Sequence, residues 1–317
     1  MTEPRRRRWI LATLCVPFVA LAAAKLVAPD AALPLIWASS GAVWAFLPAW
    51  LLLAVALARR DRLAVALSGA VVLCHVAWVA PIFVPEARAD VAGPRVRVVA
   101  ANVLYVNRTP DALLDELLAT DADVLVLEEV SPMWMTRLES DRVRAAYPHR
   151  DLLARDDAFG IAILARHPIA RSELVDLGGV PMIDATVRIA GRPLRVFGVH
   201  TLPPYDAEYA EVWRGQLAQL YALVAAVDEP LVVAGDFNGT LHNPGVAALR
   251  DAGVRDVHDA LGAGVVSTWP NGIFVAPPLA LDHVFVSDHL TPLSVREGVG
   301  AGSDHRPLIV DLRVDGA

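Results

Sequence analysis

Residues 87–317 of this 317-residue chain contain no cysteine and no lysine. The two cysteines of the chain, Cys15 and Cys74, lie inside apolar stretches, so disulfide bonds do not hold the C-terminal part together. The same C-terminal part carries 31 acidic residues against 20 basic ones, all of them arginine, which gives a net charge of about −11. A protein that grips long DNA through its backbone usually presents a basic face. The composition therefore argues against a disulfide scaffold and against general duplex binding.

Charged residues are also scarce in the N-terminal part, where three apolar stretches cover residues 9–28, 36–58 and 63–84. Each stretch is close to the roughly 20 residues that cross a bilayer core. A cleaved signal peptide is the alternative for the first stretch, because Arg5 to Arg8 precede it, but two further apolar stretches follow directly. We therefore predict a membrane anchor over residues 1–86 with three transmembrane helices.

Arginines mark one side of this anchor. They lie before the first stretch and between the second and the third, at Arg5 to Arg8 and at Arg59, Arg60 and Arg62. The positive-inside rule places both groups in the cytoplasm. Three crossings then leave residues 85–317 outside, so the sequence predicts a multi-pass protein of the cell membrane with a cytoplasmic N-terminus. The bilayer is the partner of the anchor, and no protein partner is indicated.

The C-terminal part reads as one domain over residues 95–317, joined to the anchor by a linker at residues 87–94. The segment PEARADVAGP marks this linker through small residues, charges and two prolines without periodicity. Expected strands cover residues 95–103, 123–130, 159–166, 183–189, 193–200, 230–238, 279–287 and 306–312, and expected helices cover residues 110–119 and 206–227. Strands interleaved with helices indicate a layered α/β fold.

Polar residues recur where these apolar strands end, and strand ends are where a rigid scaffold presents its chemistry. They are Asn102, Glu129, His200, Asp236, Asn238, Asp282, Asp304 and His305. Glu128 and Glu129 are neighbours, so on a strand their side chains point to opposite faces and one of them can enter a site. A carboxylate in that place suits a hard cation such as Mg²⁺, and a solvated strand end is the alternative.

Two other pairs suit phosphoester chemistry. Asp236 and Asn238 stand at positions i and i+2, on one side of an extended segment, where an acceptor and an amide suit a nucleophilic water and a phosphoryl oxygen. An Asx turn is the alternative for that pair. Asp282 and His305 supply a carboxylate and an imidazole, which together make a general acid or base.

The remaining histidines carry weaker signals. His200 ends a strand, and a lone histidine there is more often structural than functional. His283 falls on the strand face opposite Asp282, and Asp288–His289 lies in a segment typical of a turn. None of these positions defines a site by itself.

Taken in order, the motifs resemble a known family. AANV, DVLVLEEV, FGIAILARHPI, FGVHT, VVAGDFN, LDHVFVS and GSDHRPL follow one another between about residues 95 and 313. This series resembles the endonuclease/exonuclease/phosphatase superfamily, metal-dependent phosphoesterases that include DNase I and the neutral sphingomyelinases, here in a bacterial, membrane-anchored form. The resemblance implies a four-layered α/β sandwich, in which two packed β-sheets are flanked by helices. It also implies Mg²⁺ as the cofactor, with Mn²⁺ as the alternative.

The resemblance further implies roles for the residues at the strand ends. Glu129 matches the principal metal ligand, and Asn102 and Asp304 match positions beside the metal and the phosphate. The implied catalytic group is His305, Asp282, Asp236, Asn238 and His200: Asp282 orients His305, Asp236 and Asn238 surround the attacking water, and His200 contacts the scissile phosphate. Whether His305 or Asp236 takes the proton of the water stays open.

Two positions depart from the pattern of relatives. Glu128 stands where the family usually has glutamine, which adds negative charge near the metal. Leu104 stands where apurinic endonucleases carry an aspartate, which points away from abasic-site repair.

The sequence therefore predicts a membrane-anchored, Mg²⁺-dependent phosphoesterase that uses in-line attack of water. The acidic domain favours a small or lipid-borne phosphoester as substrate, with nucleic acid as the runner-up. The alternative that is not an enzyme is a binding or scaffold domain that has lost its catalytic residues. This sequence keeps every catalytic position that the resemblance implies. Arginines lining a groove beside the site would favour the nuclease.

Overall fold

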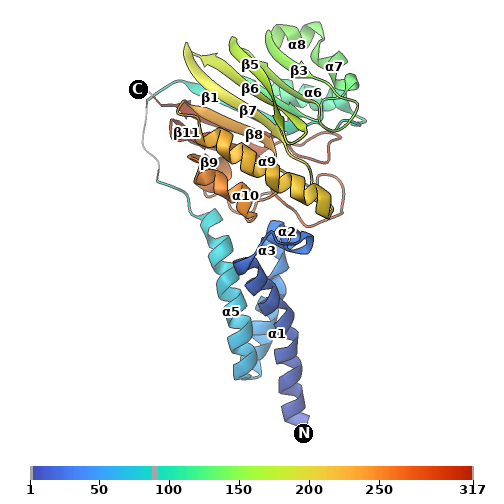
Figure 1. Cartoon of the computed structure of the whole chain (residues 1–317), viewed down its shortest axis with the longest axis vertical. Coiled ribbons are helices and arrows are strands. Elements are labelled where there is room, and N and C mark those ends of the chain that lie inside the picture. The colour runs from blue at the N-terminus through green and yellow to red at the C-terminus, as the bar shows by residue number, and fades with distance from the viewer. Residues whose placement is uncertain (1–2, 88–91, 316–317) are drawn as a thin grey trace.

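The computed structural model describes residues 3–87 and 92–315, so half of the predicted linker at residues 87–94, residues 88–91, lies outside the described residues. Within them, two six-stranded sheets pack face to face (Figure 1). Sheet A has the order β11 (Leu290–Glu297), β12 (Leu308–Val314), β1 (Arg95–Asn102), β2 (Val124–Glu128), β4 (Ile161–Ala165) and β3 (His149–Leu153). Sheet B has the order β5 (Ile169–Leu177), β6 (Val180–Ile189), β7 (Arg192–His200), β8 (Leu231–Asp236), β10 (Asp282–Ser287) and β9 (Val254–Asp256).

Alternation along each strand divides the core into layers. In β1, Val98 and Ala100 are buried between the sheets, whereas Val99 and Ala101 are buried on the outer face. Helices α6 (Pro110–Ala119), α7 (Pro132–Leu138) and α8 (Asp141–Ala146) cover sheet A, and α9 (Ala207–Ala225) and α10 (Pro244–Ala247) cover sheet B. The short elements η2 (Ala248–Arg250) and α11 (Val257–Ala260) flank β9. The predicted four-layered α/β sandwich is confirmed.

The pairing of the strands brings their polar ends to one edge. β1 runs parallel to β2, and β7 runs parallel to β8, so the carboxyl ends of each pair meet. The register sets His200 beside Asp236, and Asp236 in turn opposite Asp282 of the antiparallel β10. Gly235 permits this pairing, because a Cβ atom there would lie 1.9 Å from the carbonyl oxygen of Val199. A row of three candidate residues thus follows from register alone.

The N-terminal part differs in one respect from the three straight spans that the sequence predicts. Two helices are long and apolar enough to cross a membrane: Trp9–Val27 within α1 (Glu3–Val27), and Arg62–Phe83, formed by α5 (Arg62–Val79) and η1 (Ala80–Phe83). The second predicted stretch, residues 36–58, is instead broken into α2 (Leu33–Ser40), α3 (Ala42–Ala45) and α4 (Leu47–Ala58). The two parts of this stretch meet at 88°.

The break has a local cause. Gly41 follows two serines, a sequence that weakens a helix, and α4 begins with a proline in its first turn, which has no N–H to continue the preceding helix. We call residues 33–46 the elbow. The 12 residues of α4 make a helix of only about 18 Å, so α4 alone is shorter than the apolar core of a bilayer.

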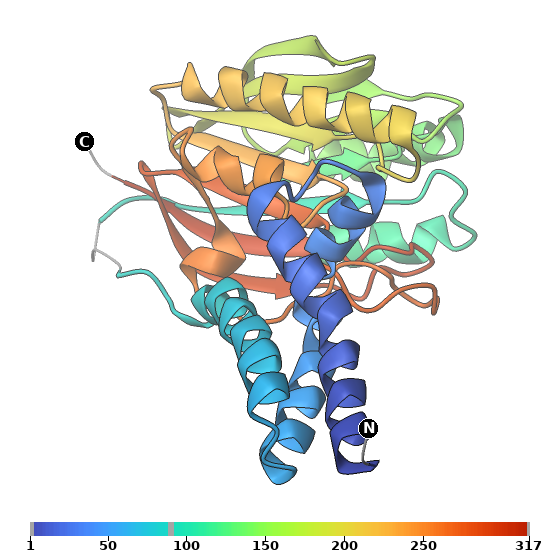
Figure 2. The ribbon, with the colours of Figure 1, turned by 60° about the horizontal axis from the view of Figure 1, so that its bottom comes forward.

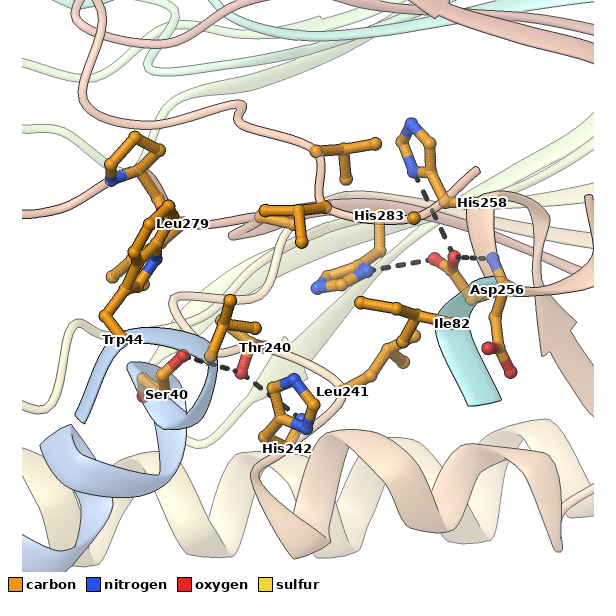
Figure 3. A pocket seen from close by; sticks show the side chains of 17 residues that line it. Ser40, Trp44, Ile82, Thr240, Leu241, His242, Asp256, His258, Leu279 and His283 are labelled. Carbon is orange, nitrogen blue, oxygen red and sulfur yellow. Dashed lines mark hydrogen bonds and ion pairs between the residues drawn. The ribbon is translucent and has the colours of Figure 1, made fainter. Parts of the chain in front are cut away.

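The elbow docks on the sandwich, beyond the bundle of α1, α4 and α5 (Figures 1 and 2). Ile36 is fully buried in the same apolar cluster as Trp213 of α9. Asn243 is fully buried as well: its Nδ2 atom donates to the carbonyl oxygen of Ile36 at 3.1 Å, and its Oδ1 atom accepts from Ser40 Oγ at 2.9 Å. Thr240 Oγ1 donates to the carbonyl oxygen of Ser40, a contact visible in Figure 3. Burial and hydrogen bonds therefore join the anchor to the loop that follows β8.

Candidate active site

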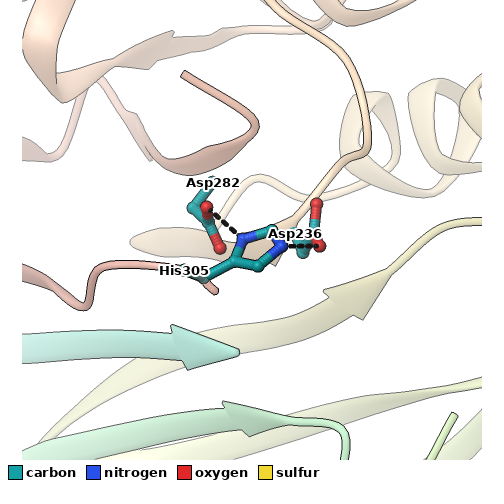
Figure 4. Close-up of side chains that lie close together, drawn as sticks. All are labelled: Asp236, Asp282 and His305. Atoms are coloured by element: carbon teal, nitrogen blue, oxygen red, sulfur yellow. Dashed lines mark hydrogen bonds and ion pairs between the residues drawn. The ribbon is translucent and has the colours of Figure 1, made fainter. Parts of the chain in front are cut away.

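An imidazole between two carboxylates forms the centre of the site (Figure 4). His305 Nδ1 lies 2.8 Å from Asp282 Oδ2, and His305 Nε2 lies 3.6 Å from Asp236 Oδ2. Burial lowers the pKa of His305, but the charges of Asp282 and Asp236 outweigh burial and raise the pKa to about 10. His305 is therefore held as an imidazolium near neutral pH.

Asp236 is the acid that connects the other groups. Its Oδ2 atom accepts from Asn102 Nδ2 at 3.2 Å and lies 3.7 Å from His200 Nε2, and its Oδ1 atom accepts from the backbone N–H of Asn238 at 2.8 Å. Burial raises the pKa of Asp236 and lowers the pKa of His200. The structure thus brings Asn102 and His200, which are far away in the sequence, to Asp236 and the neighbouring Asn238.

Glu129 stands at the other side of Asn102. Its Oε1 atom accepts from Asn102 Nδ2 at 2.9 Å, and its Oε2 atom accepts from the backbone N–H of Tyr105 at 3.0 Å. Glu129 has a φ of 62°, a left-handed conformation that is uncommon outside glycine and is found at functional sites. This turn of the backbone directs Glu129 away from the line of β2. Burial raises the pKa of Glu129.

Glu128, the neighbour of Glu129, lies inside the sandwich. It is completely buried, and neither of its carboxylate oxygens has a hydrogen-bond partner among the described residues. Burial, and then the charges of Asp282 and Asp236, raise its pKa well above the usual range of a glutamate. The two glutamates point to different surroundings, but not through strand alternation: β2 ends at Glu128, and Glu129 lies beyond the strand. Glu128 is buried behind the site, and the expectation that it meets solvent is wrong.

The loop before β12 delivers Asp304 and His305. Ser303 Oγ donates to the carbonyl oxygen of Asn102 at 2.7 Å, which ties this loop to the end of β1. Gly302 has a φ of 73°, and a Cβ atom there would collide with Thr109 and Asn107. Small residues therefore precede the aspartate–histidine pair because the loop must turn and pass close to its neighbours.

Asp304 and Asn238 complete the eight predicted residues. Asp304 Oδ2 accepts from the indole N–H of Trp269 at 3.3 Å, and its Oδ1 atom is buried without a partner among the described residues. Asn238 Nδ2 donates to the carbonyl oxygen of Thr201 at 2.8 Å, which fixes the amide across the ends of β7 and β8.

Six of the eight predicted residues line one cavity of about 820 Å³. They are Glu129, His200, Asp236, Asn238, Asp304 and His305, whereas Asn102 and Asp282 lie behind them in contact with residues of the wall. Other walls are aromatic: Trp37, Tyr105, Phe159, Tyr205, Tyr209 and Trp269. No lysine or arginine is found among the described residues that line the cavity. The basic groove expected beside a nuclease site is thus missing from this lining.

The residues at the cavity floor fit a divalent cation. Hard cations take oxygen ligands, mainly carboxylates. Here Asp282 Oδ1 and Asp304 Oδ1 are buried without hydrogen-bond partners among the described residues, and the charge of Asp304 raises the pKa of Glu129, so these acids share one region. Ligand atoms of Asp236, Asp282 and His305 also lie within 4.8 Å of one another. This cluster differs from the ligands that the sequence predicts, Glu129, Asn102 and Asp304, and that ligand set stays a prediction.

Two of the three weaker histidine signals lie outside this cavity, as the sequence predicts, whereas the third, His200, lines it. His283 lies behind the site. Its Nδ1 atom lies 2.9 Å from Asp256 Oδ2 (Figure 3), and its Nε2 atom lies 2.9 Å from the carbonyl oxygen of Gly239. Asp288 and His289 form the exposed turn between β10 and β11.

The aromatic lining of the cavity does not follow from the sequence, and its two tryptophans show why. Trp269 follows no strand, and nothing near it in the chain marks it. Trp37 lies in an apolar stretch that resembles a span, so nothing there indicates a site.

Comparison with known proteins identifies relatives of the sandwich. A profile of the Endonuclease/Exonuclease/phosphatase family matches residues 99–305. The structure of an endonuclease/exonuclease/phosphatase from Beutenbergia cavernae DSM 12333 is 22% identical over 70% of this chain and 72% of its own, with a TM-score of 0.57. D. rerio TDP2 complexed with a single-strand DNA product is 20% identical over 69% of this chain and 99% of its own, with a TM-score of 0.59. The human Nocturnin catalytic domain with a bound sulfate anion is 20% identical over 70% of this chain and 95% of its own, with a TM-score of 0.55. No curated protein matches the chain.

Proposed function

Because the chain belongs to the Endonuclease/Exonuclease/phosphatase family and is thereby a metal-dependent phosphoric ester hydrolase, we propose that it is a membrane-anchored, Mg²⁺-dependent phosphoesterase that acts by in-line attack of water. One observation carries the proposal: Asp236 lies between His305, His200 and Asn102 at the floor of an open cavity. A carboxylate surrounded by donors suits a water that must lose its proton beside a phosphate.

The residues of the chain have separate tasks in this proposal. Asp236 accepts the proton of the attacking water, and Asn238 holds that water and a phosphoryl oxygen. His305 is charged through its contact with Asp282, so it stabilises the negative charge that grows on the phosphoryl group in the transition state. His200, whose pKa is lowered by burial, donates a hydrogen bond to the same group in its neutral form.

Glu129 is the ligand we assign to the metal, with Asn102 and Asp304 beside it. When bound there, Mg²⁺, or Mn²⁺ in its place, supplies positive charge that polarises the phosphoryl oxygens. The hydrogen bonds from Asn102 and from the backbone of Tyr105 hold the Glu129 carboxylate in a fixed orientation. That fixed orientation is the contribution of the chain to metal binding.

The N-terminal part acts as the anchor in this proposal, with residues 1–86 in or at the membrane, a linker at residues 87–94 and the catalytic domain at residues 95–317. α1, α4 and α5 alternate in direction, so the turn between α4 and α5 lies at the same end as the N-terminus (Figure 1). The N-terminal segment and the turn between α4 and α5 both carry arginines, which the positive-inside rule places in the cytoplasm. The catalytic domain at the other end is then extracytoplasmic.

A small or lipid-borne phosphoester is the substrate we propose. The acidic domain and the cavity without lysine or arginine do not favour a polyanion, which is normally held by several cationic contacts. Nucleic acid is the second candidate, since one structure with this fold, that of D. rerio TDP2, holds a single-strand DNA product.

The test uses the purified full chain with bis(p-nitrophenyl) phosphate, p-nitrophenyl phosphate, phosphatidylcholine vesicles and single-stranded DNA. We expect Mg²⁺- or Mn²⁺-dependent hydrolysis of an ester, lost in chelator and strongly reduced in Glu129→Gln. Glu139→Gln is the matched control, because that glutamate is exposed on the far side of sheet A. Full activity in excess chelator would contradict the proposal, and a preference for DNA of more than about tenfold would replace it with the nuclease.

A further inference from the structure

The wall of the catalytic cavity is completed by the membrane anchor. Trp37, Ser40 and Gly41 of the elbow line the same cavity as Asp236 and His305. These three residues precede residue 99, where the family match begins, so this wall is an addition of this chain to the shared sandwich. The anchor therefore contributes to the site itself and is more than a tether.

Trp37 is held in place yet remains open to a ligand. Its indole N–H donates to the carbonyl oxygen of Pro204 at 2.9 Å, and 53% of the residue is still exposed. Its neighbour Ile36 is fully buried in the core beside α9, so the backbone of α2 is fixed on the sandwich. A large, rigid apolar surface thus borders the cavity without being covered by the protein.

The chemistry of the other walls matches that surface. Polar groups that suit a phosphate gather at the floor, whereas aromatic side chains line the sides: Tyr105, Phe159, Tyr205, Tyr209 and Trp269. A cavity of about 820 Å³ is far larger than a phosphate group requires. Its shape and lining fit a substrate with a phosphoester at one end and an apolar part at the other.

The elements next to the elbow also expose apolar side chains. Leu47, Trp50 and Leu51 are exposed at positions i, i+3 and i+4 of α4, so they share one face of that helix. Phe274 is fully exposed in the loop that runs into the cavity wall, and Trp44 Nε1 donates to the carbonyl oxygen of Pro278 in that same loop at 2.8 Å. Exposed apolar side chains therefore lie both on this loop and on the helix that follows the elbow.

We propose that Trp37 binds the apolar chain of a lipid phosphoester that lies in the same membrane as α1 and α5, while the phosphate of that lipid reaches Asp236 and His305. The elbow is then a specificity element, which selects substrates that carry an apolar chain. The inference rests on the proposed phosphoesterase function, and it deepens that function by naming the substrate class.

The experiment compares two phosphodiesters that release the same soluble p-nitrophenol and differ only in their alkyl group, methyl p-nitrophenyl phosphate and dodecyl p-nitrophenyl phosphate. The full-length protein in phosphatidylcholine vesicles is assayed with each ester, and the ratio of the two kcat/KM values is the readout. We expect Trp37→Ala to lower the dodecyl-to-methyl ratio about tenfold, the effect of losing the burial of roughly two methylene groups. Partition of the dodecyl ester into the vesicle is the same for every variant and cancels. Trp37→Phe should restore most of the ratio.

Trp44→Ala is the matched control. Trp44 belongs to the same elbow and also donates an indole hydrogen bond to the sandwich, but it lines the neighbouring small pocket and not the catalytic cavity (Figure 3). The dodecyl-to-methyl ratio of the Trp44→Ala variant should stay within about twofold of the wild type, since a residue outside the binding site contributes little to substrate selection.

The possible outcomes separate the two proposals. An unchanged ratio in Trp37→Ala, an equal loss for both esters, or an equal shift in Trp44→Ala overturns the role of Trp37 and leaves the phosphoesterase standing. If the wild type hydrolyses the methyl ester and gains nothing from the dodecyl chain, the lipid substrate is overturned alone. If neither ester is hydrolysed with Mg²⁺ or Mn²⁺, the proposed function fails and this inference fails with it.

Discussion

The Nδ1 atom of His305 lies 2.8 Å from Oδ2 of Asp282, although the two residues come from different sheets. Asp282 begins β10 in sheet B, and His305 lies in the loop that enters β12 of sheet A. The contact therefore exists only when the two sheets are packed, which couples the charge of the imidazole to the fold. His305 gains its proton affinity from this contact, so both its titration and its catalytic role should depend on Asp282.

The titration of His305 is the first prediction. In the metal-free protein its imidazole should stay protonated well above pH 8, because Asp282 and Asp236 raise its pKa to about 10. Asp282→Asn should lower that pKa, since the neutral amide removes the closest charge. NMR of the imidazole resonances against pH measures both values. Asp288→Asn is the control, because that carboxylate is exposed and pairs with Arg255 instead. Identical titrations in the wild type and Asp282→Asn would contradict the proposed pairing.

The raised pKa of His305 also makes the stability of the folded protein depend on pH. The pKa of His305 is raised in the folded state, so its contribution to stability is fully present below about pH 6.5, its unfolded value, and is lost as the pH rises through about 10.

Catalysis provides the second prediction. His305→Ala should lower kcat by roughly 10²–10³, as expected when a positioned charge that stabilises the transition state is lost. His289→Ala should be nearly silent, because His289 lies in an exposed turn outside the cavity. Steady-state kinetics on one phosphoester compares the two variants. Equal losses would mean that the wrong histidine was chosen.

The sequence predicted the sandwich because its central strands are long apolar runs with clear ends. β1, β7, β8 and β10 each begin or end at a polar residue of the site. The strands that escaped prediction lie in other settings. β3 and β5 are edge strands, of which β3 is only partly buried throughout and β5 is mostly exposed, and β11 contains Pro292, which disfavours a strand except at an edge. Their pairing depends on neighbours that the local sequence does not contain.

The residues of the candidate site also divide into those that the sequence predicts and those that it does not. Asp236, Asn238 and His305 stand in short motifs at strand ends, so their proximity could be predicted. Trp37 could not, because its place in the cavity depends on the bend at Gly41 and on Ile36 entering the core of another part of the chain. Hydropathy reads residues 36–58 as one span. Gly41 allows the bend, but the position of α2 beside the cavity depends on its packing against the sandwich.

Membrane topology is the third prediction. With α1, the bent α2–α4 segment and α5 counted as three crossings, a reporter fused after Ala317 should be active only if it works outside the cytoplasm. A matched fusion in the turn at Arg60 should be active only with a cytoplasmic reporter. The opposite pair of results would contradict this topology, either because the orientation is reversed or because the bent segment does not cross the membrane. Activity of the same reporter at both positions would show that α5, the only span between the two fusion points, does not cross it.

Glu128 gives the last prediction. This carboxyl is completely buried without a hydrogen-bond partner among the described residues, and burial together with Asp282 and Asp236 raises its pKa well above the usual range. The folded state therefore holds a proton that the unfolded state releases near pH 4.5. The stability that Glu128 contributes is fully present below that pH and is lost as the pH rises through the raised value.

Glu128→Gln keeps the shape of the side chain and removes its titration. In chelator at pH 8, the variant should be more stable than the wild type by about 1–3 kcal/mol, because the wild type must then take up a proton or bury a charge when it folds, at about 1.4 kcal/mol for each unit by which the pKa is raised. At pH 5 the two proteins should differ little, because Glu128 is then protonated in the folded wild type. Thermal unfolding at both pH values measures the difference, and Glu139→Gln, at an exposed site, controls for the general effect of removing one acid. A gain in stability of the same size at pH 5 and pH 8 would show that packing, and not the proton, distinguishes the two side chains.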